Sequence, residues 1–132
     1  MLNKVFPDKE KAKSLLKMAV VRKKSVDSLD MKYVTIISEN YYEIIKELST
    51  ALFLLNGIKY VGVNAHKEMI DGLKRFSVFG EDEILVLQDL RIRRNNSQYE
   101  GEPFSESYIE NKRKVLNLII DKLKKLVEDR LI

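Results

Sequence analysis

Three arginines, Arg91, Arg93 and Arg94, stand close to the amide side chains of Asn95 and Gln98 in the stretch from residue 91 to residue 99. Guanidinium groups form paired, charge-assisted hydrogen bonds with phosphate or carboxylate oxygens, and amides orient a ligand through neutral hydrogen bonds. This combination of side chains is typical of a site for a phosphate-bearing ligand.

The spacing of this stretch puts polar side chains on a helix face that begins as core. Ile84 and Leu87 are three residues apart, as expected for an apolar helical stripe. The same helical spacing then reaches three polar residues, Arg91, Arg94 and Gln98. Because a polar group held against a protein surface must find partners, we expect a second subunit, a phosphate-bearing ligand or buried carboxylates of the same fold beside them.

The residues from Arg94 to Tyr99 fit an Arg-x4-Tyr pattern, in which Asn95 directly follows the arginine. This pattern resembles the motif of the HEPN domains, a family named for higher eukaryotes and prokaryotes nucleotide-binding. That motif is an arginine followed by four to six residues and then a histidine. The spacing and Asn95 are similar to those of many members, whereas Tyr99 stands where the histidine is more usual.

The resemblance implies a homodimer in which the motif helices of two chains face each other around one cleft. Active members of the family cut RNA without a metal. Their arginine neutralises phosphoryl charge, their asparagine positions a group, and their histidine moves the proton of the attacking 2′-hydroxyl. By this resemblance the catalytic set would be Arg94, Asn95 and Tyr99, with no cofactor. An ordinary phenol, with a pKa of about 10, is a poor base at neutral pH.

Three functions stay open. The preferred one is an RNA- or nucleotide-binding HEPN-like homodimer that acts with a minimal nucleotidyltransferase in a toxin-antitoxin type system, as the resemblance implies. Arg91, Arg93 and Gln98 would then assist in binding the ligand. The second is a metal-independent endoribonuclease that uses the motif from Arg94 to Tyr99. The third is a helical bundle whose dimerisation is its whole function.

The same residues also allow interpretations without a ligand. The arginines can pair with Asp89, Glu100 and Glu102 on a solvated helix end, where cations are favoured in any case. His66, the single histidine, is interpreted as a capping or packing residue, because no orienting partner stands near it in the sequence. Lysine runs elsewhere are interleaved with acids and are interpreted as the wet sides of amphipathic helices.

Composition limits the possible classes of protein. The 132 residues, 45% of them hydrophobic, are enough for one domain over residues 1–132. Without cysteine, and with one histidine, there is no basis for a disulfide, a thiolate site or a zinc cluster. No apolar run reaches the length of a signal peptide or membrane span, so we expect a cytoplasmic protein without a membrane partner. The net charge of +4 favours an anionic ligand only mildly.

The elements that must position the motif are helices. Five glycines and two prolines fall between segments of helical periodicity, which predicts an all-α fold, an antiparallel four-helix-type bundle with a short additional helix. We expect helices over residues 8–28, 31–56, 65–76 and 80–101, with a loop at 58–63. A capping box of Ser107 and Glu110 should start the fifth helix. This order of helices is similar to the HEPN arrangement across essentially the whole chain.

Overall fold

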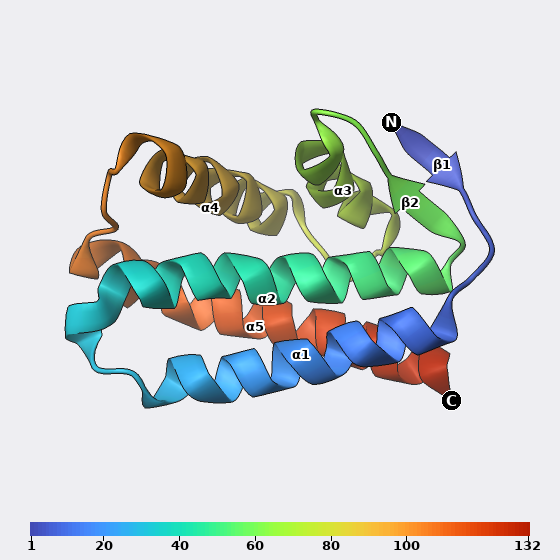
Figure 1. Cartoon of the computed structure of the whole chain (residues 1–132), viewed down its shortest axis with the longest axis horizontal. Helices are drawn as coiled ribbons and strands as arrows, with labels where there is room; N and C mark the ends of the chain where they lie inside the picture. Colours follow the sequence, from blue (N-terminus) through green and yellow to red (C-terminus); the bar gives the residue numbers. More distant parts are fainter.

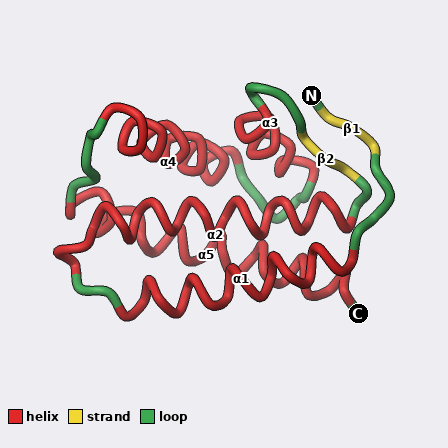
Figure 2. Tube along the Cα trace, viewed as in Figure 1, coloured by secondary structure: helices red, strands yellow, loops and turns green.

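The computed structural model describes residues 1–132 and contains five α-helices and one very small sheet (Figures 1 and 2). The helices are α1 (Lys9–Ser28), α2 (Val34–Leu55), α3 (Ala65–Gly72), α4 (Glu81–Glu100) and α5 (Glu106–Leu131). The strands are β1 (Leu2–Lys4) and β2 (Ile58–Tyr60). The predicted all-α bundle of five helices is confirmed.

Helix α2 is the central rod of the bundle, with α1 and α5 against one side of it (Figure 1). Apolar residues occur around most of its circumference, which is why it is buried by neighbours on several sides. Its buried side chains form the largest share of a single core of 29 residues. None of the five helices is both long and apolar enough to cross a bilayer.

Helices α3 and α4 pack on the side of α2 that faces away from α1 (Figure 1). Helix α4 contributes Ile84, Leu87 and Leu90 to the core, all from its first half. No residue of α4 after Leu90 is buried. The predicted change from an apolar to a polar face therefore occurs inside this helix.

Side-chain hydrogen bonds mark the starts of α1, α4, α5 and the turn before α2, with one exception to the expected residues, whereas Asn64 at the start of α3 makes none. Asp8 accepts a hydrogen bond from the backbone N–H of residue 11 at 3.0 Å, and Asp30 caps a short 3-10 turn that leads into α2. The N–H of Gly80 donates to Glu83 Oε1 at 3.1 Å at the start of α4. The exception is α5, whose cap is Ser105 and not Ser107: Ser105 Oγ accepts from the N–H of residue 108 at 3.2 Å.

The exception has a tertiary cause. The N–H of Phe104 donates to Thr35 Oγ1 of α2 at 3.1 Å, and the Phe104 side chain is buried in the core. This contact fixes the chain just before Ser105, so α5 begins two residues earlier than the capping-box pattern predicts. A pattern within one segment carries no information about an anchor 69 residues away.

The prediction of a loop over residues 58–63 is wrong for residues 58–60, which form strand β2. Strand β2 pairs antiparallel with β1, so that Leu2 lies opposite Tyr60 and Lys4 opposite Ile58. Gly57, with a φ of +69°, makes the turn out of α2 and accepts a hydrogen bond from the N–H of Val5 at 2.9 Å. Strands of three residues are too short to produce an alternating pattern, which is why the sequence did not reveal them.

The predicted third helix is also shorter than expected. Helix α3 ends at Gly72, and the remaining residues to position 75 form a 3-10 turn. A Cβ atom at Gly72 would lie 2.1 Å from the hydroxyl of Tyr60, a residue of β2. The absence of a side chain at Gly72 therefore lets α3 pack against β2.

Candidate functional site

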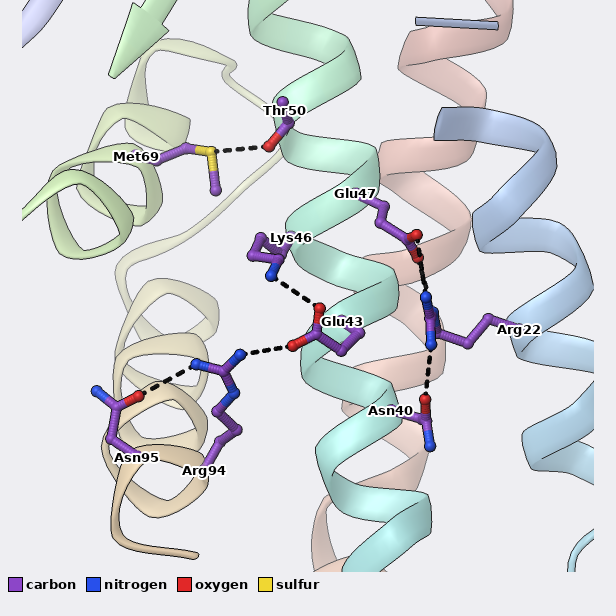
Figure 3. Close-up of polar contacts among 9 residues, drawn as sticks. All are labelled: Arg22, Asn40, Glu43, Lys46, Glu47, Thr50, Met69, Arg94 and Asn95. Atoms are coloured by element: carbon purple, nitrogen blue, oxygen red, sulfur yellow. Dashed lines mark hydrogen bonds and ion pairs between the residues drawn. The ribbon is translucent and has the colours of Figure 1, made fainter. Parts of the chain in front are cut away.

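Arg94 reaches from α4 towards α2, and only 11% of its side chain is exposed (Figure 3). One terminal nitrogen donates to Glu43 Oε1 at 2.6 Å, and the other donates to Asn95 Oδ1 at 3.3 Å. The guanidinium carbon lies 4.8 Å from the centre of the Tyr42 ring. Arg94 Nε has no hydrogen-bond partner within the protein. The side chain is thus contacted on three sides, and its unpaired Nε–H is buried within the protein.

Glu43 is the carboxylate that orients Arg94. Its second oxygen pairs with Lys46 Nζ at 2.8 Å (Figure 3). Burial alone would raise the pKa of the Glu43 carboxyl, but hydrogen bonds and charges from Lys46 and Arg94 together lower that pKa below its usual value. Glu43 is therefore ionised at neutral pH.

The structure shows which partner Arg94 has within the chain. Its partner is a partly buried carboxylate of the same fold, Glu43, and none of the acids near the motif in the sequence. Arg93 does follow the sequence-based interpretation, since its Nε donates to Asp89 Oδ2 at 2.8 Å.

A cavity of about 300 Å³ opens between α4 and the segment that begins α3. It brings together four of the six residues predicted for the site. Its walls consist of Gly62, Val63, Asn64, Ala65, His66, Lys67, Arg91, Arg94, Asn95 and Tyr99. Three of these side chains are cationic and none is acidic, so the cavity is suited to an anion.

Arg91 is fixed in the wall by contacts between α3 and α4. Its Nε donates to Gln88 Oε1 at 2.8 Å. Gln88 in turn donates to the carbonyl of Lys67 and to Asp71 Oδ1, both at 3.0 Å. The chain of hydrogen bonds ties the two helices together and gives Arg91 a defined position. Tyr99 lies at the other end of the cavity wall with 75% of its surface exposed.

Arg93 and Gln98 do not line this cavity. Arg93 points to another side of α4, where its guanidinium lies 4.9 Å from the Tyr108 ring and borders a separate hollow. Successive residues of a helix are about 100° apart, so neighbouring arginines necessarily diverge. Gln98 is exposed to solvent.

His66 is the cavity residue whose role the sequence did not indicate. It belongs to α3 and is exposed to solvent, and its ring centre lies 6.3 Å from that of Tyr42. It also lines the cavity beside Arg91 and Arg94. No local signal could have found it, because the two helices meet only through tertiary packing.

The electrostatic surroundings favour the neutral form of the imidazole. Partial burial lowers the pKa of His66, and the positive charges of Lys46, Arg94 and Arg91 lower it further. The negative charge of Glu43 opposes this effect without cancelling it. The neutral form of His66 is therefore favoured at neutral pH.

Comparison with family models, with curated proteins and with solved structures finds no match for this chain. Two ordered guanidiniums can bind phosphate oxygens, Asn95 can add a neutral hydrogen bond, and the exposed ring of Tyr99 can stack on a base.

Proposed function

We propose that this chain binds RNA or a nucleotide in the cavity between α3 and α4, with Arg94, Asn95 and Tyr99 as the central residues and Arg91 as an additional cation. The observation that carries the proposal is the composition of the cavity wall, which contains three cationic side chains and no acid. Such a wall attracts phosphate groups and repels cations, and cations placed on rigid helices lose little entropy on binding.

We further propose that the protein acts as a homodimer in which α4 of one copy faces α4 of the other. Three exposed apolar side chains, Leu85, Ile92 and Tyr99, recur every seven residues along α4, with exposures of 66%, 48% and 75%. Apolar residues seven positions apart align along one side of a helix, which gives a second helix an apolar surface to pack on. Because Tyr99 belongs both to this stripe and to the cavity wall, such a dimer would bring two cavities to one interface.

The biological setting that we propose rests on the resemblance to HEPN domains alone. It is a toxin-antitoxin type system in which a minimal nucleotidyltransferase is the partner protein. Copurification of this chain with a nucleotidyltransferase expressed from a neighbouring gene would support this setting. If this chain does not copurify with the nucleotidyltransferase, the proposed partner is wrong, and the ligand site is still tested separately.

The test of ligand binding is a titration of fluorescently labelled RNA, followed by anisotropy. We expect binding that weakens as salt rises, because phosphate contacts release counterions. Arg91→Gln and Arg94→Gln should each weaken binding about tenfold or more. Arg22→Gln is the matched control: Arg22 is an equally ordered arginine, paired with Glu47 at 2.9 Å on the α1 side of α2 (Figure 3).

If all three variants bind RNA as tightly as the unmodified protein, the proposed site is wrong. The same mixtures, incubated with EDTA and separated on a denaturing gel, report whether RNA is cut. If the unmodified protein cuts RNA and Arg94→Gln does not, the chain is a ribonuclease and not only a binding protein. Intact RNA in every lane supports binding without turnover.

A further inference from the structure

His66 is the only histidine of the chain, and it lies in the wall of the one cavity that also holds Arg91, Arg94 and Lys67. It enters this wall from α3, whereas the two arginines enter from α4. An imidazole in such a place differs from its cationic neighbours in one respect. It is the only group in the wall whose charge can change near neutral pH.

The charged groups around His66 come from every helix that borders it. Helix α2 supplies Lys46 and Glu43, α4 supplies Arg91 and Arg94, and Lys67 follows His66 on α3. Three cations thus act on the ring against one carboxylate, with Lys67 in the same wall, and that carboxylate is already shared between Arg94 and Lys46. The cationic surroundings disfavour the protonated imidazole, so an added negative charge would favour proton uptake by His66.

Building on the proposed function, we propose that His66 is a direct ligand of the phosphate group in this cavity and that it takes up one proton when a doubly charged phosphate binds. The protonated imidazole then donates a hydrogen bond to a phosphate oxygen, as the arginines do. Proton uptake requires enough negative charge to offset the neighbouring cations. A terminal phosphate monoester carries up to two negative charges and an internal phosphodiester carries one.

The class of ligand follows from this difference. The cavity selects a mononucleotide or a phosphorylated RNA end over an uninterrupted strand. Binding and protonation are then linked: affinity rises as pH falls between the His66 pKa of the bound state and that of the free state, by about tenfold per pH unit. Outside that interval the affinity does not depend on His66 protonation.

The experiment uses inorganic sulfate as the probe, because sulfate has the shape of phosphate and stays doubly charged between about pH 5 and pH 8, the range in which histidine titrates. NMR of the imidazole is unambiguous, since the chain contains a single histidine. We expect sulfate to raise the His66 pKa by at least one pH unit. Sulfate affinity should also increase as the pH falls from 8 to 5, by up to about tenfold for each unit of that pKa shift.

Two variants of His66 test whether proton uptake by its side chain causes the pH dependence. His66→Gln keeps a hydrogen-bond donor but cannot take up a proton, so its sulfate affinity should be the same over this pH range. His66→Asn repeats the test with a smaller side chain, and circular dichroism confirms that each variant folds. Lys67→Gln is the matched control, because it removes a neighbouring cation of the wall. It should weaken sulfate binding while keeping the dependence on pH.

The ligand class is tested at about pH 7, above the second pKa of a phosphate monoester, near 6. Adenosine 5′-monophosphate should bind the unmodified protein about tenfold more tightly than the dinucleoside monophosphate ApA. His66→Gln should narrow this ratio.

The outcomes distinguish the two proposals. If sulfate and the monophosphate bind but the His66 pKa does not move, or if both nucleotides bind equally, the role of His66 is overturned and the proposed function stands. If neither nucleotide nor RNA binds at any pH, both proposals fail.

Discussion

At the scale of single residues, the most informative group is Glu43. It pairs with both Arg94 and Lys46, and it thereby stabilises two cations in a partly buried place. The same carboxylate competes with any anion that enters the cavity, because it already occupies one face of the Arg94 guanidinium. Stability and ligand affinity are therefore opposed at this position.

Glu43→Gln tests that opposition. The variant should bind sulfate about tenfold more tightly, since Arg94 loses its competing negative charge. It should also unfold about 1 to 2 kcal/mol more easily, because two partly buried cations lose their partner. Isothermal calorimetry and urea denaturation measure the two effects.

Glu47→Gln is the control, because Glu47 pairs with Arg22 on the α1 side of α2 and has no part in the cavity. It should lower stability without changing sulfate affinity. A gain in affinity for Glu47→Gln would show that the effect of Glu43→Gln is one of overall charge and not of competition for Arg94.

At the scale of elements, helix α4 divides its surface among three tasks. One side contributes Ile84, Leu87 and Leu90 to the core, a second lines the cavity, and a third exposes the stripe of Leu85, Ile92 and Tyr99. A helix offers room for such a division because its side chains project in all directions around the axis. Changes to the exposed stripe should leave the core intact.

Ile92→Glu tests the role of the stripe. It places a charge in the middle of the proposed helix pair, where two copies would repel each other, so self-association should weaken at least tenfold with little change in the unfolding free energy. Sedimentation equilibrium over a range of concentrations measures the association. Leu118→Glu is the control, because Leu118 is a similarly exposed apolar residue on α5. A monomeric unmodified protein at about 100 μM would contradict the α4 interface.

Some features of the helices could be predicted from the sequence, and others could not. The polar end of the apolar stripe on α4 was predictable, because helical periodicity is a property of neighbouring residues. The pairing of Glu43 with Arg94 was not, since 51 residues separate them and only the packing of α4 on α2 brings them together. The place of His66 in the cavity was hidden for the same reason. Ser105 as the cap of α5 depended on Thr35, another distant contact.

At the scale of the whole molecule, protonation of the cavity affects the folding equilibrium. The pKa of His66 is lower in the folded chain than its ordinary value of 6.5, so the unfolded chain binds more protons between the two values. Stability should therefore decline as pH falls below about 7 and level off once the folded-state pKa is passed. Carboxylates such as Glu43, whose pKa is lowered, add their own loss of stability only at a more acidic pH.

Urea denaturation between about pH 5 and pH 7.5 measures this decline. In His66→Gln the decline over this interval should disappear, because no other histidine is present. A decline of the same size in the variant would assign it to other groups. Added sulfate should also reduce the decline in the unmodified protein, since the bound anion favours the protonated ring.

One consequence of the exposed position of Tyr99 is spectroscopic. The chain contains no tryptophan, so Tyr99→Trp introduces the only indole of the molecule, at a point shared by the cavity wall and the apolar stripe. Its emission would shift to shorter wavelength when a second copy covers the stripe, and a stacked nucleobase would quench it. Dilution alters the first signal and nucleotide the second, so one fluorophore would follow both events in a single cuvette.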